Sequence, residues 1–171
     1  MSSTPEVTES GVLTCADIDI EHLAALLNRF GLSLEIVPDG EAIAGSWFGD
    51  PEAGIIKRRV LVRLDTPLHS ALHESCHNIC MDEARRSRLH TDAGGDYDEE
   101  NAVNYMEITL ADYLPGLGRE RIMADMDAWG YTFRLGSAQA WFEQDAEETR
   151  LRLIQQELLD ENGEPTWRLR A

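Results

Sequence analysis

The segment LHSALHESCHNIC, residues 68–80, places two histidines four positions apart, with a glutamate directly after the first. On an α-helix, residues at this spacing lie one turn apart on the same face, so the rings of His73 and His77 can converge on one ion. Histidine nitrogen is a donor that suits Zn²⁺. Glu74 is turned about 100° from His73 around the helix, which places it beside the ion, where it can act as a base. The spacing therefore predicts a zinc site with a neighbouring catalytic carboxylate.

Two histidines do not complete such a site, because hydrolytic zinc centres usually have three protein ligands and a water. The segment DYDEENAVNYMEITLADYL, residues 96–114, offers Glu99 and Glu100 in the first turn of a predicted helix. Glu99 is in line with the apolar stripe of this helix, so its carboxylate is aimed at the interior, where a metal would compensate its burial. Glu100 is rotated off the stripe, with Asn104 one turn further on. We favour Glu99 over Glu100, although either acid is also well placed at a helix N-terminus without a metal.

Two other side chains near the motif are alternative third ligands. His90 can reach the histidines only if the loop that carries it folds back. Cys80 shares the histidine face, but it lies about 10.5 Å along a straight helix from His73, too far for all three to bind one ion. We expect Cys80 to be a small buried apolar residue, and we rank either glutamate above His90.

The elements before the motif are predicted to be one helix and a small sheet. Residues 17–31 have apolar side chains at helical spacing and end in a glycine, which indicates an amphipathic helix. Turn-rich pieces separate the strand-like segments that follow, which are LSLEIVP (32–38), AIAGSWF (42–48) and GIIKRRVLVRL (54–64). These segments predict a mostly antiparallel sheet of about three strands.

The rest of the chain is predicted to be helix and loop. Thr66 and Pro67 suit the N-cap and first position of a helix that contains the histidines and runs to about Arg86. Asp98 can cap the helix that carries the two glutamates. Ser137 opens a long final helix.

This order of elements predicts one α+β domain, in which the small sheet packs on the histidine-bearing helix and further helices follow. We place a flexible N-terminal arm at residues 1–16, the domain at 17–160 and a C-terminal tail at 161–171, frayed apart from Trp167. A chain of 171 residues is long enough to bury a core without disulfides.

The composition restricts the partners. The chain has 15 basic and 32 acidic residues, a formal charge of −17, which disfavours direct binding to nucleic acid or to an anionic membrane surface. It contains no apolar run of membrane-spanning length, and we expect no N-terminal signal sequence, because no apolar segment follows a basic start. Three cysteines, Cys15, Cys76 and Cys80, do not suggest a disulfide framework. We expect a protein of the reducing cytoplasm.

The HExxH sequence on a helix, followed by a helix with a glutamate, resembles the zincin metallopeptidases, in particular their gluzincin-like branch. Residues 20–115 look most similar to the compact ImmA/IrrE-type enzymes, which follow HExxH with an E-x-x-A-N-x-F-A helix. Glu99, Ala102 and Tyr105 match the glutamate, alanine and aromatic of that pattern. Val103 stands where asparagine is expected, and the stretch before Pro115 is longer, so the resemblance is specific only at HExxH.

The resemblance implies a minimal zincin-like fold and a peptidase that cleaves a peptide or protein substrate with a zinc-activated water. It implies that His73, His77 and one of the two glutamates bind Zn²⁺ and that Glu74 is the general base. One alternative is a catalytically silent zincin-like module that binds metal and acts as a regulator or interaction partner. Another is a helical interaction protein in which the motif is coincidental. The sequence leaves substrate specificity, regulation and oligomeric state open.

Overall fold

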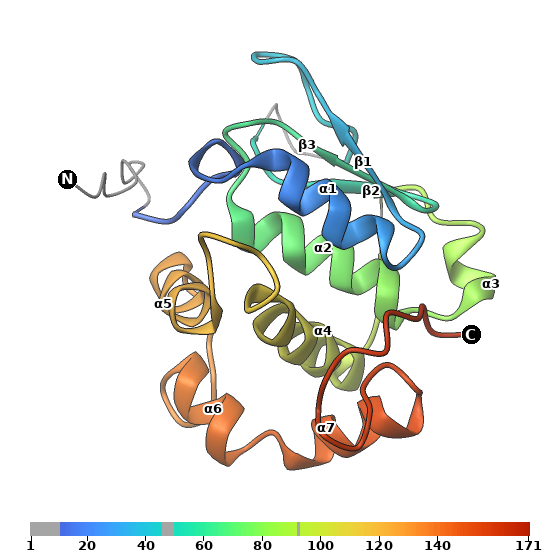
Figure 1. Ribbon diagram of the computed structural model, residues 1–171, viewed down its shortest axis with the longest axis vertical. Helices are drawn as coiled ribbons and strands as arrows, with labels where there is room; N and C mark the ends of the chain where they lie inside the picture. Colours follow the sequence, from blue (N-terminus) through green and yellow to red (C-terminus); the bar gives the residue numbers. More distant parts are fainter. Residues whose placement is uncertain (1–10, 46–49, 92) are drawn as a thin grey trace.

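The helix that carries the two histidines lies at the centre of the structure, between the sheet and the C-terminal helices (Figure 1). The computed structural model describes residues 11–45, 50–91 and 93–171. Over these residues the fold is α+β, as the sequence predicts, with seven α-helices and one three-stranded sheet. The elements are η1 (Cys15–Asp17), α1 (Ile20–Asn28), β1 (Ser33–Ile36), β2 (Gly54–Ile56), β3 (Arg59–Val62), α2 (Leu68–Cys80), α3 (Glu83–Arg86), α4 (Tyr97–Ala111), α5 (Arg119–Trp129), α6 (Ala138–Gln144) and α7 (Glu147–Gln155).

The sheet is mixed, which corrects the prediction of a mostly antiparallel sheet. Its strand order is β1-β3-β2, with β1 parallel to β3 and β2 antiparallel to β3. The segment expected to be one long strand, 54–64, turns back at Lys57, whose φ of 51° suits a tight turn, and so supplies both β2 and β3. Of the predicted strand 42–48, residues 42–45 lie outside the sheet and 46–48 lie outside the described residues.

Helix α2 packs its apolar face on the core, as expected from the helical wheel. Leu68, Leu72 and Ile79 are all fully buried. The predicted extension to Arg86 is wrong, because Met81 has an extended backbone, with φ −77° and ψ 156°. Asp82 then caps the separate short helix α3 by accepting a hydrogen bond from the Arg85 backbone at 2.8 Å.

The caps at the start of three helices differ in part from the prediction. Asp96, not Asp98, caps α4, accepting a hydrogen bond from the Glu99 backbone at 2.9 Å. Thr66 does not cap α2, since its hydroxyl accepts from the Arg63 backbone. Ser137 caps α6 as predicted, through the Ala140 backbone at 3.1 Å. The expected single final helix is divided into α6 and α7.

Both ends of the described chain pack against the core. Residues 1–10 of the predicted arm lie outside the described residues, but Leu13 is buried and its backbone donates to Asp125 at 3.0 Å. The tail is not frayed. Trp167 stacks near Phe30, with ring centroids 5.1 Å apart, and the Arg170 backbone donates to the carbonyl of Ile79 at 3.0 Å.

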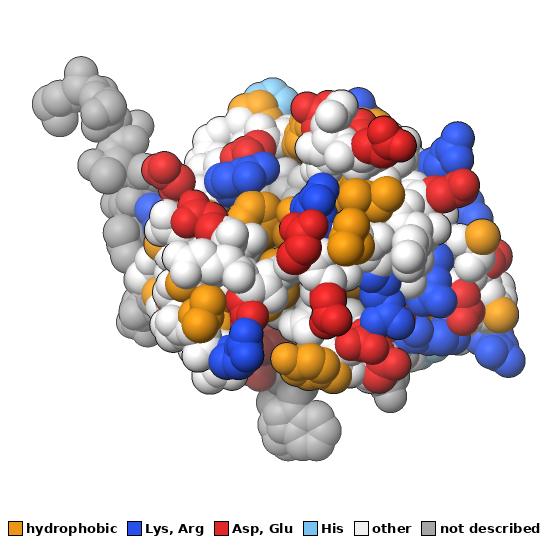
Figure 2. All heavy atoms as spheres, turned by 90° about the horizontal axis from the view of Figure 1, so that it is seen from below, with side chains coloured by type: hydrophobic (Ala, Val, Ile, Leu, Met, Phe, Trp, Pro, Cys, Tyr) orange, Lys and Arg blue, Asp and Glu red, His pale blue; other side chains and the backbone are white. Residues whose placement is uncertain are grey.

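The face formed by α6 and α7 carries acidic and basic side chains intermingled (Figure 2). Ion pairs there join Arg150 to Glu147 at 2.9 Å and Arg152 to Asp98 at 2.8 Å. The excess of acidic residues therefore does not make this face uniformly negative. Among the described residues, no helix has the length and apolar character needed to cross a membrane.

Candidate metal centre

Three side chains converge where α2 packs against the first turn of α4. Nε2 of His73 lies 2.8 Å from Oε1 of Glu100, and Nε2 of His77 lies 3.2 Å from Oε2 of the same carboxylate. The two imidazole centroids are 4.9 Å apart, as expected for residues one helical turn apart. The structure thus brings together both predicted histidines and one of the two predicted glutamates.

This donor set fits zinc in chemistry and in spacing. Two imidazole nitrogens and one carboxylate are a ligand set of hydrolytic zinc sites. The ligand atoms of His73, His77 and Glu100 all lie within 4.8 Å of one another. Tetrahedral ligands at zinc bond lengths are separated by about 3.3 Å, close to both histidine-to-Glu100 distances. Small side-chain adjustments would therefore suffice to enclose an ion.

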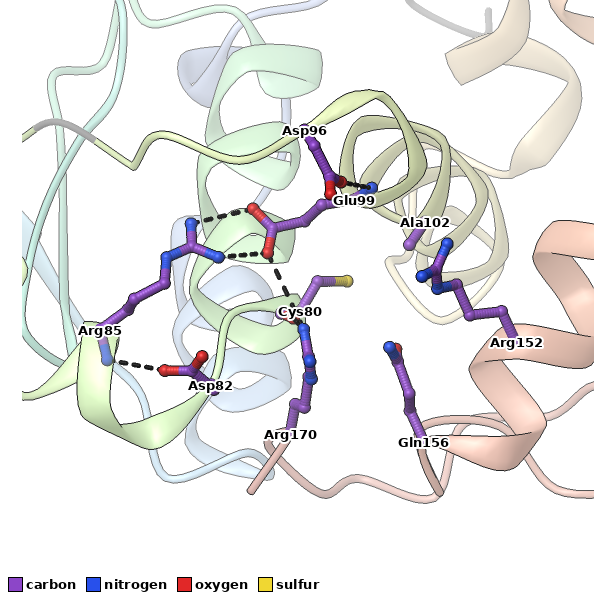
Figure 3. Close-up of a pocket in the computed structure, with 9 residues that line it drawn as sticks. All are labelled: Cys80, Asp82, Arg85, Asp96, Glu99, Ala102, Arg152, Gln156 and Arg170. Atoms are coloured by element: carbon purple, nitrogen blue, oxygen red, sulfur yellow. Dashed lines mark hydrogen bonds and ion pairs between the residues drawn. The ribbon is translucent and has the colours of Figure 1, made fainter.

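The preference for Glu99 over Glu100 is not supported by the geometry. Glu99 is buried, as its place on the apolar stripe indicated, but its partner is Arg85, whose Nη1 and Nη2 lie 2.5 and 3.0 Å from its two oxygens. Figure 3 shows this pair at the edge of a polar cavity into which Arg170 also projects. Oε2 of Glu99 is 4.0 Å from Nδ1 of His77, on the opposite side of the ring from Nε2. Glu99 therefore lies behind His77 and not with the converging atoms.

The glycine-bearing loop before α4 serves this arrangement of Glu99. Gly95 has a φ of 103°, and a side chain at this position would collide with the Glu99 carboxylate. The loop thus approaches the Glu99 carboxylate closely and leaves room for Glu99 to pair with Arg85.

The electrostatics of the converging groups resemble a strong ion pair. Burial lowers the pKa of His73, but the neighbouring carboxylates of Glu100 and Glu107 outweigh it and raise the pKa to about 10. Hydrogen bonds from His73 and His77 hold the pKa of Glu100 far below its usual range. In the metal-free protein a proton on His73 therefore balances a carboxylate that could otherwise bind a cation.

Glu74 follows His73 on α2 and is half-buried. Burial raises the pKa of its carboxyl, while the nearby charges of His77 and His73 oppose the rise. A carboxylate whose pKa is shifted toward neutrality, near two imidazoles but outside the converging set, has the properties of a general base.

Neither alternative third ligand joins the cluster. His90 is exposed, and its backbone forms an isolated bridge with Ile56 beside the sheet. Cys80 is buried and lines the polar cavity near Arg85, and burial strongly raises the pKa of its thiol. Its expected role as a small buried residue agrees with this placement.

Glu107 and Tyr131 were not identified from the sequence. Glu107 is wholly buried on α4, with Oε2 3.6 Å from Nδ1 of His73. The sequence does contain a signal for it, because Glu100 and Glu107 are seven positions apart and so share a helical face. Tyr131, just after α5, has no comparable signal, since only the packing of α5 brings it to the site.

Comparison of the chain with protein-family models, with curated proteins and with solved structures found no match.

Proposed function

We propose that the protein is a zinc-dependent peptidase in which His73, His77 and Glu100 hold Zn²⁺ and Glu74 is the general base. The observation that carries the proposal is the convergence of the Nε2 atoms of both histidines on the Glu100 carboxylate, at 2.8 and 3.2 Å. Glu74 directly follows His73 in the chain. The His-Glu-x-x-His spacing and the carboxylate on the following helix supply the ligands of a gluzincin-like centre, with Glu100 in place of Glu99.

The exposure of the three ligands suits a hydrolytic site. The side chains of His73 and His77 are 16% and 7% exposed, whereas that of Glu100 is 47% exposed. The two buried histidines would hold the ion from the protein side, and the exposed side of the site leaves access for water and a substrate.

Each group has a defined task in peptide hydrolysis. Zinc, when bound, supplies a Lewis acid that polarises the scissile carbonyl and makes water more acidic. Glu74 accepts the proton of the attacking water and returns a proton to the leaving amine. The α2 backbone holds Glu74 and both histidines within two turns of one helix, so their relative positions are fixed by the fold.

The test is Glu74→Gln, with zinc content and cleavage of a peptide library measured on the same samples. We expect the variant to keep zinc, because Glu74 is not among the converging ligands, and to lose activity by about 10²- to 10⁴-fold. Glu52→Gln is the matched control, because Glu52 is exposed and its charge is the weakest of the charges that shift the pKa of Glu74. We expect this control to cleave like wild type.

Other outcomes separate the rival functions. Equal cleavage by wild type and Glu74→Gln would exclude Glu74 as the base. Stoichiometric zinc without cleavage of any peptide by wild type would favour the silent metal-binding module. Failure of the wild type to bind zinc would leave an interaction protein with a coincidental histidine cluster.

A further inference from the structure

A fully buried carboxylate lies behind the candidate metal centre. Glu107 on α4 has no exposed surface, and its Oε2 is 3.6 Å from Nδ1 of His73. Within the described part of the chain, neither of these two atoms has a hydrogen-bond partner. A donor position and an acceptor position without other partners thus lie 3.6 Å apart.

The other oxygen of this carboxylate is contacted by a tyrosine that follows α5. The hydroxyl of Tyr131 donates to Oε1 of Glu107 at 3.5 Å and lies 3.3 Å from Nδ1 of His69. The Tyr131 ring also meets the His73 ring edge-on, with centroids 5.7 Å apart. His69 in turn packs on Trp129, with centroids 4.8 Å apart. Glu107 thus lies between the candidate ligand His73 and the half-buried Tyr131.

Burial of an acidic side chain without full pairing is costly, so its presence in this position calls for a compensating interaction. A histidine that binds a metal through one nitrogen commonly donates its other N–H to a carboxylate, which fixes the ring and its tautomer. Nε2 of His73 faces Glu100, and Nδ1 faces Glu107. Each nitrogen of the His73 ring therefore faces one carboxylate. This is the arrangement expected of a histidine that binds a metal through Nε2 and donates its Nδ1–H to a carboxylate.

We propose that Glu107 is a positioning residue, which accepts the Nδ1–H of His73 and so directs Nε2 of that ring to the metal, and that Tyr131 holds Glu107 in place. This proposal rests on the proposed zinc centre. It extends that centre by one layer of side chains, from α4 and from the segment that follows α5, and it assigns no contact with substrate to either residue.

Zinc affinity, measured by competition with a chromogenic chelator, tests the proposal without requiring a substrate. We expect Glu107→Ala to weaken zinc binding by about 10- to 100-fold. Glu107→Gln should lose less, because its amide oxygen still accepts the Nδ1–H. Tyr131→Phe should also lose less than Glu107→Ala, because it removes only the support of the carboxylate.

Thr109→Val is the matched control for the integrity of α4. Thr109 is buried on the same helix, and its hydroxyl donates to the Tyr105 carbonyl at 2.9 Å, away from the metal site. We expect wild-type zinc affinity for this control. A loss equal to that of Glu107→Ala would contradict the proposal, because it would show that any change within α4 weakens the site.

A nitrogen-15 NMR spectrum of the zinc-loaded protein gives a second readout that general destabilisation would not imitate. We expect His73 to carry its proton on Nδ1, and zinc coordination through Nδ1 would overturn the proposal. If Glu107→Ala does not fold, Glu107→Gln decides, because it keeps the side-chain volume. Wild-type zinc affinity in both Glu107 variants would refute the role of Glu107 and leave the zinc centre standing. Absence of zinc binding by wild type would refute both.

Discussion

Nε2 of His73 on α2 lies 2.8 Å from Oε1 of Glu100 on α4, although the side chain of Glu99 is the more deeply buried of the two adjacent glutamates. This contact decides which acid belongs to the candidate metal centre. Glu99 has its own cation in Arg85, whereas the partners of Glu100 are the two imidazoles.

Alanine substitution at the adjacent glutamates should have unequal effects. Glu100→Ala removes a ligand, so we expect it to weaken zinc binding by more than the roughly 10- to 100-fold typical for loss of an outer partner. Glu99→Ala removes only the carboxylate behind His77 and should fall within that smaller range. Isothermal titration with zinc measures both, and each variant is the control for the other. A larger loss from Glu99→Ala would restore the assignment favoured by the helical pattern.

Zinc affinity should rise with pH. Burial lowers the pKa of His73, but the neighbouring carboxylates of Glu100 and Glu107 raise it to about 10, so the metal-free site holds a proton at neutral pH. Zinc binds the neutral imidazole and must displace that proton, which lowers the affinity on the acid side of the pKa. The pKa of Glu100 is lowered, so its carboxylate stays ionised and adds no further dependence.

We therefore expect about a tenfold gain in affinity for each unit of pH between roughly 6.5 and 8.5. Titrations in buffers of different ionisation enthalpy should also report the release of a proton on zinc binding. An affinity that is flat or falls with pH over this interval would show that His73 is already neutral in the metal-free protein.

The turn between α2 and α3 should depend on one buried arginine. Arg86 is 1% exposed and donates to the carbonyls of Asn78, Met81 and Arg170 at 2.9, 2.5 and 3.0 Å. Arg86→Ala leaves these acceptors unsatisfied, so we expect it to reduce the free energy of unfolding by about 3 kcal/mol or more. Denaturant unfolding of the metal-free protein measures the change.

Arg150→Ala is the control for Arg86, because Arg150 pairs at the surface with Glu147. We expect little effect from this change. If the two substitutions cost the same, the buried contacts of Arg86 do not hold the C-terminal segment against α2.

The histidine-bearing helix and its buried face could be predicted because they depend on local spacing. Leu68, Leu72 and Ile79 repeat at helical intervals, and His73 and His77 fall on another part of the same wheel. The predicted α+β class also depends mainly on the order of such patterns. These features need no knowledge of distant contacts.

The choice between the two glutamates could not be predicted, because adjacent residues differ by about 100° around a helix. Which of them faces α2 depends on the rotation of α4 against its neighbours. Arg85, on the separate helix α3, forms an ion pair with Glu99. A helical wheel of α4 alone cannot indicate this partner. The direction of β1 beside β3 likewise depends on packing far along the chain.

The most direct test of the central claim is an anomalous-difference map of the zinc-loaded crystal, recorded across the zinc absorption edge. We expect a single strong peak bonded to Nε2 of His73, Nε2 of His77 and the carboxylate of Glu100. A map without a peak between these atoms, or with the ion bound by Glu99 in place of Glu100, would contradict the account.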